Sequence, residues 1–280
     1  MTVDSIIAFE SLGYTKREAS FLYLVAAHSG YFLRRQFDYF IDRNRGSIVM
    51  RFLEKARIAG HIESLDYKQG WHVYHLCSRS IYRLAGKPDS QLRRRKGDAE
   101  VRARLMTLDY VLENENDRFL ESAEERIRFF SKDQFIQRTC FTDDDGNLHP
   151  LLASSPISLA EPDRPRQSLV RLAFIDEGLL TIEKFLRFLS ATEQLLRAIG
   201  NFEVIYVAVS EVNFADAKDA FWKRFDKSLP MSAGLFDDDD RRIVSHIVAP
   251  LQARFTTLLF RYAYPTLRRS EARGSERVRK

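Results

Sequence analysis

Residues 61–77, HIESLDYKQGWHVYHLC, decide how the N-terminal part of this chain folds. Polar and apolar side chains alternate in the two flanking runs, 61–65 and 71–76, as they do in half-buried β-strands. The five residues between the runs, DYKQG, have the composition of a tight turn. The stretch therefore predicts a β-hairpin with its tip at 66–70.

Three helical patterns precede this hairpin. The first begins at Thr15, where TKRE has the spacing of a capping box, and ends at Gly30. The second covers residues 34–42, and the third covers 47–59 with an apolar stripe formed by Ile48, Phe52, Leu53 and Ala56. Three short helices followed by a hairpin predict a winged helix-turn-helix domain over residues 10–86. Such a domain lays one helix in a DNA groove and a loop beside it.

The net charge of +5 is unevenly distributed along the chain. Residues 1–86 hold 12 basic and 8 acidic side chains, and residues 87–104 hold 7 and 3. Residues 105–264 hold 19 basic and 26 acidic side chains, whereas the last segment, 265–280, holds 6 and 2. We expect phosphate to attract the basic N-terminal part and to repel the acidic body. The alternative is that the basic linker and tail only aid solubility.

Basic and polar side chains of the N-terminal part are the candidate DNA-binding residues. We expect those of the third helix to enter the groove and those at the start of the second helix to contact the DNA backbone. The residues at the hairpin tip would reach an adjacent groove or phosphate. The full set is Arg34, Arg35, Arg45, Ser47, Arg51, Lys55, Arg57, Lys68, Gln69, Arg93, Arg94 and Arg95. The alternative is an ordinary solvated basic face.

The remaining sequence predicts a connector and a second domain. Residues 87–140 are expected to form a basic linker and a helical connector, in which 98–137 is one bent helix or two. Residues 141–265 are expected to contain strands at 168–177 and 202–209 and helices at 181–199, 214–225 and 239–262. A strand, a crossover helix and an apolar strand predict a small α/β domain. The basic tail, 266–280, is expected to be disordered, and the fold class of the whole chain is α+β.

Evidence for an enzyme is weak in this sequence. Asp176 and Glu177 at a strand end, with Lys184 on the next helix, are the candidates for a metal-dependent nuclease. Such a site needs converging carboxylates and a group that activates water. Adjacent strand residues point to opposite faces, so a third acid, Glu161 or Asp163, would be needed. We expect no catalytic site, no metal and no cofactor, and keep the divergent nuclease as an alternative.

The sequence also bears on the compartment. It has no apolar run of about 18 residues, and its first residues lack the features of a signal peptide. The two cysteines have no partner at a disulfide or zinc spacing. We therefore expect a cytoplasmic protein with no membrane contact.

The order of winged helix, basic linker and small α/β domain resembles the replication-relaxation family of plasmid and mobile-element proteins. The resemblance covers about residues 10–225 and is carried by LGY at 12–14, TKRE at 15–18, Gln36-Phe37, Leu53 and GHI at 60–62. It implies a second domain similar to a restriction endonuclease that has generally lost its nuclease residues. FIDE at 174–177, Lys184 and the strand 204–209 occur in a matching order.

Together these patterns favour a sequence-specific protein that binds double-stranded DNA, namely a transcriptional regulator. A role in a plasmid or mobile element follows from the resemblance. The second domain would sense an unknown small ligand, bind a protein or mediate assembly. A homodimer is expected, with apolar positions in 105–137 or in the last helix, around Ile243, Ile247, Leu251, Leu258 and Leu259, as its contact. The alternative is that both groups of apolar residues pack within the core of the monomer. A winged helix that binds protein is the remaining alternative.

Overall fold

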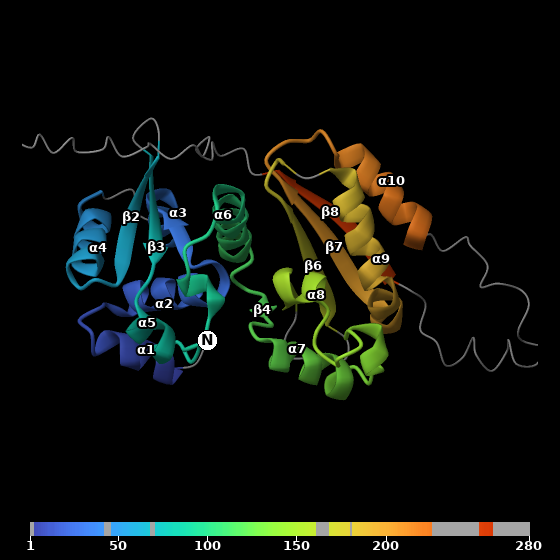
Figure 1. The fold of residues 1–280 in the computed structure, drawn as a ribbon, viewed down its shortest axis with the longest axis horizontal. Helices are drawn as coiled ribbons and strands as arrows, with labels where there is room; N and C mark the ends of the chain where they lie inside the picture. Colours follow the sequence, from blue (N-terminus) through green and yellow to red (C-terminus); the bar gives the residue numbers. More distant parts are fainter. Residues whose placement is uncertain are drawn as a thin grey trace, which may run out of the picture. The chain divides into compact units, whose positions relative to one another are not determined.

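The computed structural model describes residues 3–41, 46–67, 71–160, 168–179, 181–225 and 252–259. It is a mixed α+β protein whose described part divides into two compact units, one ending at Glu113 and the other beginning at Asn114 (Figure 1). None of the helices in these ranges is long and apolar enough to cross a bilayer.

The first unit contains a three-stranded antiparallel sheet and several helices. The strand order is β1-β3-β2, and the pairing of Leu65 with Val73 fixes the register of the β2–β3 hairpin. The predicted hairpin and the three predicted helices, which are α2, α3 and α4, are confirmed, whereas α1, β1 and α5 were not predicted. The predicted tip at 66–70 is wrong at its start, because Asp66 and Tyr67 pair with β3 as part of β2. The elements are α1 Val3–Glu10, α2 Lys16–Leu24, the π-helical turn η1 Val25–Ser29, β1 Tyr31–Leu33, α3 Arg34–Phe40, α4 Gly46–Ile58, β2 Ile62–Tyr67, β3 Trp71–Leu76, α5 Arg79–Leu84, the 3₁₀ turn η3 Gln91–Arg93 and α6 Asp98–Glu113.

Local sequence explains where α2 begins. Thr15 Oγ1 accepts a hydrogen bond from Glu18 N at 3.4 Å, and Glu18 Oε2 accepts one from Thr15 N at 2.8 Å. This is the capping box that TKRE predicts, and it satisfies two backbone donors that a helix start otherwise leaves free. The predicted start of this helix is confirmed.

An aromatic cluster holds the helices of the first unit against β1. Phe21 of α2, Phe32 of β1, Phe37 of α3 and Phe52 of α4 are fully buried. The rings of Phe37 and Phe52 have centroids 4.1 Å apart, and those of Phe21 and Phe37 lie 4.9 Å apart. Since each ring comes from a different element, this cluster fixes how α2, α3 and α4 pack around one another.

The helix α6 belongs to the first unit and is tied to α3 by polar side chains. Buried Gln36 donates from Nε2 to Leu105 O and to Asp109 Oδ1, both at 2.8 Å, while its Oε1 accepts from Leu33 N at 2.8 Å. Arg35 makes a bidentate ion pair with Asp109 at 2.7 and 2.8 Å. The boundary between units therefore lies after Glu113, and the first half of the predicted 87–140 connector is part of the first unit.

The second unit is a five-stranded mixed sheet with helices. The strand order is β4-β5-β6-β7-β8; β4, β5 and β6 pair antiparallel, and β6, β7 and β8 pair parallel. Its elements are β4 Arg118–Phe119, α7 Ala123–Arg128, the π-helical turn η4 Phe129–Asp133, the 3₁₀ turn η5 Arg138–Cys140, α8 Pro150–Ser154, β5 Ile157–Ala160, β6 Leu169–Asp176, α9 Ile182–Ile199, β7 Asn201–Ala208, α10 Phe214–Phe225 and β8 Gln252–Leu259.

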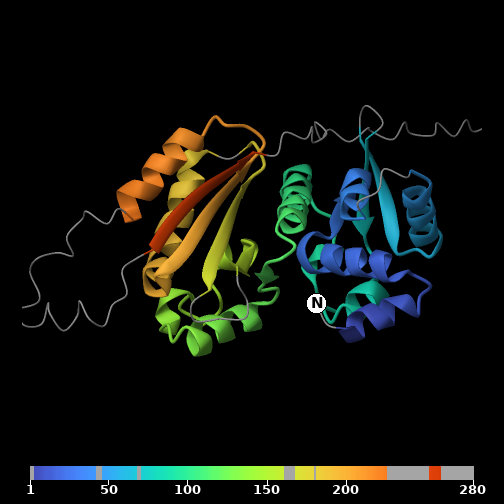
Figure 2. The same ribbon diagram turned by 180° about the vertical axis from the view of Figure 1, so that it is seen from behind.

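The predicted strand, crossover helix and strand are confirmed as β6, α9 and β7. Alternate residues of both strands, such as Leu172 and Val204, pack into one core with Leu189 of α9 and Phe221 of α10. Because both helices contribute to the same core, they cover the same face of the sheet (Figure 2). The predicted helix over 214–225 is confirmed as α10.

The stretch 98–137, for which one bent helix or two were predicted, is two helices, since α6 ends at Glu113 and β4 precedes α7. The predicted helix over 239–262 is wrong at Gln252–Leu259, which forms β8 parallel to β7. Two β-branched residues, Thr256 and Thr257, favour a strand there. The rest of that predicted helix lies outside the described residues.

A polar ladder on the other face of the second sheet helps to hold β8 in place. Arg171 of β6 donates to Asp117 at 2.7 Å and to Glu203 of β7 at 2.9 Å. The second oxygen of Glu203 accepts from Thr256 Oγ1 of β8 at 2.5 Å. The ladder therefore joins three adjacent strands through side chains, and it needs Thr256 in an extended strand.

We predict that Asp109→Ala destabilises the first unit by about 2–4 kcal/mol, because it removes the carboxylate that accepts hydrogen bonds from Arg35 and from buried Gln36. Arg34→Ala is the matched control. Arg34 makes an exposed ion pair with Asp38 on the same helix at 3.6 Å, so its loss should cost about 0.5 kcal/mol or less. Urea unfolding followed by circular dichroism measures both, and equal midpoints for the two variants would contradict the prediction.

Candidate nucleic-acid interface

One face of α4 is exposed along the whole helix. Its exposed side chains are Ser47, Met50, Arg51, Glu54, Arg57 and Ile58. At about 100° per residue these lie within an arc of about 120°, opposite the buried residues Val49, Phe52, Leu53 and Ala56. Two of the exposed residues are large and apolar: Met50 is 51% exposed and Ile58 is 75% exposed. The face thus combines two arginines with apolar and polar groups.

Arg51 and Arg57 are the predicted DNA-binding residues of α4 that the structure leaves available. Both side chains are exposed, and neither takes part in an ion pair within the described parts of the chain. Ser47 is exposed in the first turn of the same helix. Periodicity alone would have added Met50, Glu54 and Ile58 to this face, because they share its helical phase. None of the three carries a positive charge, which is the feature that marks a DNA-binding residue in a sequence.

Lys55 was predicted to contact DNA, but the structure shows it bound to Glu18 and Gly13. Its Nζ lies 2.5 Å from Glu18 Oε2 and donates to Gly13 O at 3.0 Å. It also lies 4.8 Å from the centre of the Tyr14 ring, whose hydroxyl is 2.7 Å from His61 Nδ1. Lys55 therefore ties α4 to the start of α2, and we leave it out of the proposed interface.

Arg34 and Arg35, at the start of α3, also differ from each other. Arg34 is exposed, and its one ion pair within the described residues is with Asp38, so its guanidinium can reach a phosphate. Arg35 holds Asp109 through two hydrogen bonds and is therefore a structural residue. Arg45, Lys68 and Gln69 lie outside the described residues, as do Glu161 and Asp163.

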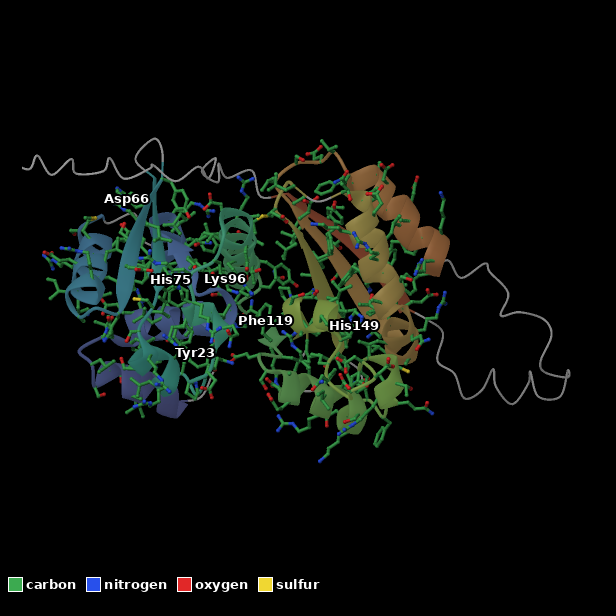
Figure 3. The ribbon with its side chains drawn as sticks, viewed as in Figure 1. Tyr23, Asp66, His75, Lys96, Phe119 and His149 are labelled. Atoms are coloured by element: carbon green, nitrogen blue, oxygen red, sulfur yellow. The ribbon has the colours of Figure 1, made fainter. Side chains whose placement is uncertain are left out.

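The linker arginines lie on a segment that is bound to the sheet of the first unit. Arg95 donates from Nε to Glu63 Oε1 at 2.7 Å, and that oxygen lies 2.8 Å from His75 Nδ1. His75 of β3 is stacked on Tyr31 with ring centroids 4.4 Å apart, and Tyr31 Oη accepts from Lys96 N at 2.9 Å. Figure 3 labels His75 and Lys96 in this unit. Arg95 is therefore an internal contact, whereas Arg94 has an exposed side chain.

Gly30 permits this close approach of the linker. Its φ is +76°, and a Cβ at this position would lie 2.5 Å from Leu92 O. Any other residue would therefore meet both a strained backbone and a steric clash. Arg93 lies beside Leu92 in η3 and is half-buried. The segment predicted as a basic linker is thus packed, and only part of its charge faces outward.

The hairpin beside α4 carries an exposed Asp–His pair on β2 and β3. Asp66 of β2 and His72 of β3 lie opposite each other, with Oδ1 and Nδ1 2.7 Å apart. The hydrogen bond from His72 lowers the pKa of the Asp66 carboxyl. Asp66 is labelled in Figure 3. Asp66 is the one acid in the sequence from 64 to 76, and His72 is its hydrogen-bond partner.

Asp176, a candidate of the nuclease alternative, has structural partners among the described residues of the second unit. Asp176 is buried and accepts hydrogen bonds from Tyr206 Oη at 2.7 Å, Gly178 N at 2.9 Å and Asn213 Nδ2 at 3.3 Å. Lys184 is exposed on α9, and within the described residues no hydrogen bond or ion pair joins it to Asp176 or Glu177. Within the described residues, no three His, Cys, Asp or Glu side chains are grouped as metal ligands. Asp176 therefore anchors the loops that follow β6 and β7.

Burial and the hydrogen bond to Asp176 raise the pKa of Tyr206, burial being the larger cause. We predict that Asp176→Ala lowers the unfolding free energy of the second unit by about 1–3 kcal/mol, because the buried Tyr206 hydroxyl loses its acceptor. Asp176→Asn keeps an acceptor oxygen and should cost less. Fluorescence of Trp222 during urea unfolding, in a Trp71→Phe background, reports on this unit. Wild-type stability of Asp176→Ala would contradict the anchoring role.

Acid should weaken the contact between the linker and the sheet. Hydrogen bonding from Arg95 lowers the pKa of Glu63 from its ordinary value of 4.5 to about 2. The carboxylate therefore stabilises the fold above pH 4.5, and this contribution is lost as the pH falls from about 4.5 to about 2. We expect Glu63→Gln to reduce the unfolding free energy at pH 7 by about 1 kcal/mol, since Arg95 is exposed and solvent screens the pair. The difference between variant and wild type should shrink in acid; a difference that is constant with pH would contradict this.

Comparison of the chain with protein-family models, with curated proteins and with solved structures found no match. The resemblance to the replication-relaxation family consequently rests on the residues quoted for it above. The function has to be inferred from the side chains and their geometry.

Proposed function

We propose that residues 10–86 form a winged helix-turn-helix domain that binds double-stranded DNA in a sequence-specific manner. In this assignment α2, α3 and α4 are the three helices, β2 and β3 form the wing, and α4 is the helix that enters the major groove. The observation that carries the proposal is the exposed face of α4, with Arg51 and Arg57 free of intramolecular ion pairs in the described chain.

The connectivity of the first unit supports this assignment. The order along the chain is helix, short strand, helix, helix and hairpin, and the short strand β1 pairs with β3 at the edge of the sheet. The hairpin therefore follows directly after α4, which also contacts β2. A helix packed beside a hairpin strand suits a protein that binds adjacent parts of a duplex.

The charges also favour DNA over a protein partner. Arg51 and Arg57 are joined by Arg34 on α3 and Arg94 in the linker as exposed cations of the same unit. Arginine pairs with phosphate oxygens and with the O6 and N7 acceptors of guanine. Neutralising several phosphates releases counterions, so binding should weaken steeply as the salt concentration rises. A protein partner bound through the apolar groups of α4 would lack this salt dependence.

Transcriptional regulation is the biological role that fits a sequence-specific DNA-binding protein of this size. The second unit would then bind a ligand or a partner, and a homodimer would engage two half-sites. The contact for such a dimer does not come from Leu105, Leu108, Leu112 or Phe130, because these side chains are buried in the cores of their own units. A plasmid or mobile-element role rests on the resemblance alone.

We predict that Arg51→Ala/Arg57→Ala weakens binding of the full-length protein to its selected duplex by about tenfold or more. One lost base contact costs about 1–3 kcal/mol, and a lost phosphate contact weakens all sequences alike. Random-pool selection provides the duplex, and fluorescence anisotropy at several salt concentrations measures the affinity. The variant should also show a shallower salt dependence.

The matched control is Arg128→Ala/Arg187→Ala, which removes two exposed arginines from α7 and α9 and so changes the net charge equally. It should retain the wild-type affinity if α4 is the DNA-binding element. Equal losses in both double variants would mean that overall charge, not α4, governs binding. Failure of the wild type to bind any duplex would reject the proposed function.

A further inference from the structure

A negative side chain occupies the middle of the face that we assign to DNA. At about 100° per residue, Glu54 lies midway between Arg51 and Arg57 on the exposed arc of α4. It is exposed, and no ion pair within the described ranges involves it. The neighbouring cation Lys55 is already held by Glu18. If α4 enters a groove, the Glu54 carboxylate enters with it.

A carboxylate in this position weakens binding to DNA unless it accepts a hydrogen bond there. The phosphates on both sides of the groove repel it, and the duplex carries about one negative charge per 1.7 Å. A residue at the rim of the arc could turn back into solvent, but one at its centre faces the bases. The only donors that the major groove offers are the amino groups of cytosine, at N4, and adenine, at N6.

Of these two bases, cytosine suits a carboxylate better. The N6 amino group of adenine lies beside the N7 acceptor of the same base, which repels a second carboxylate oxygen, whereas N4 is the one hydrogen-bonding group that cytosine itself presents in the major groove. The guanine of the same or of an adjacent pair offers O6 and N7 to an arginine. Arg51 and Arg57 each stand three residues, or about 4.5 Å along the helix, from Glu54 and can reach the adjacent base pairs.

We propose that Glu54 is a specificity-determining residue that recognises cytosine in the major groove, flanked by guanine contacts from Arg51 and Arg57. This inference rests on the proposed function, since it requires that α4 binds DNA. Glu54 adds selectivity at the expense of general affinity, because its charge opposes every duplex and is compensated only where a cytosine lies beneath it.

Random-pool duplex selection with the full-length protein tests the proposal. The wild type should select a site with a strongly preferred cytosine. Glu54→Ala should select the same site with that preference lost, and should bind unrelated duplex more tightly. Glu54→Gln should move the preference at this position from cytosine to adenine, because a glutamine amide matches the N6 and N7 groups of adenine. The preference for cytosine over the other bases should fall by about tenfold in both variants.

Glu10→Ala, which removes an exposed acid from α1, is the control for charge and should leave the selected site unchanged. Circular dichroism establishes that each variant is folded. Unchanged preferences in folded Glu54→Ala and Glu54→Gln would overturn the role of Glu54 while leaving DNA binding by α4 intact. If the wild type selects no duplex at all, it is the proposed function that fails.

Discussion

The carboxylate of Asp109 is the contact on which the arrangement of the first unit depends. Gln36 is buried at the first turn of α3, and each of its amide atoms has a defined partner: the backbone of Leu33, the backbone of Leu105 and Asp109. A buried amide is tolerated only when its hydrogen bonds are satisfied. These hydrogen bonds fix the junction of β1 and α3 to α6. In turn, α4 packs against α3 through Phe52 and Phe37.

Patterns in the sequence predicted the elements whose signals are local. The capping box at Thr15, the apolar stripe of α4 and the alternation in β2 and β3 each depend on residues close together in the chain, and each is present. The nearly apolar run of β7 likewise predicted a strand that is buried on both faces in a parallel pair. Elements that depend on distant partners could not be predicted in this way. The residues of β8 were predicted as part of a helix, because their pairing with β7 leaves no local pattern.

The candidate site shows the same division between local and long-range information. Helical phase was sufficient to place Arg51 and Arg57 on an exposed face. The partners of Arg35, Lys55 and Arg95 are 74, 37 and 32 residues away in the chain, so no local pattern reveals that these cations are engaged within the protein. A basic residue in the sequence is therefore not necessarily available to a ligand. In the structure three of the candidate DNA-binding cations, Arg35, Lys55 and Arg95, are bound to acids of the protein itself.

The packing of residues 90–96 against β1 and β3 determines where the N-terminal unit can be separated from the rest of the chain by recombination. A recombination event at residue 86 would remove Leu92 from Gly30, Arg95 from Glu63 and the whole of α6, and would expose the stacked rings of Tyr31 and His75. The smallest part of the described chain that keeps these contacts accordingly extends to Glu113. Shuffled or fused descendants of this protein should therefore carry α6 together with the hairpin, however little α6 contributes to the surface that meets a ligand.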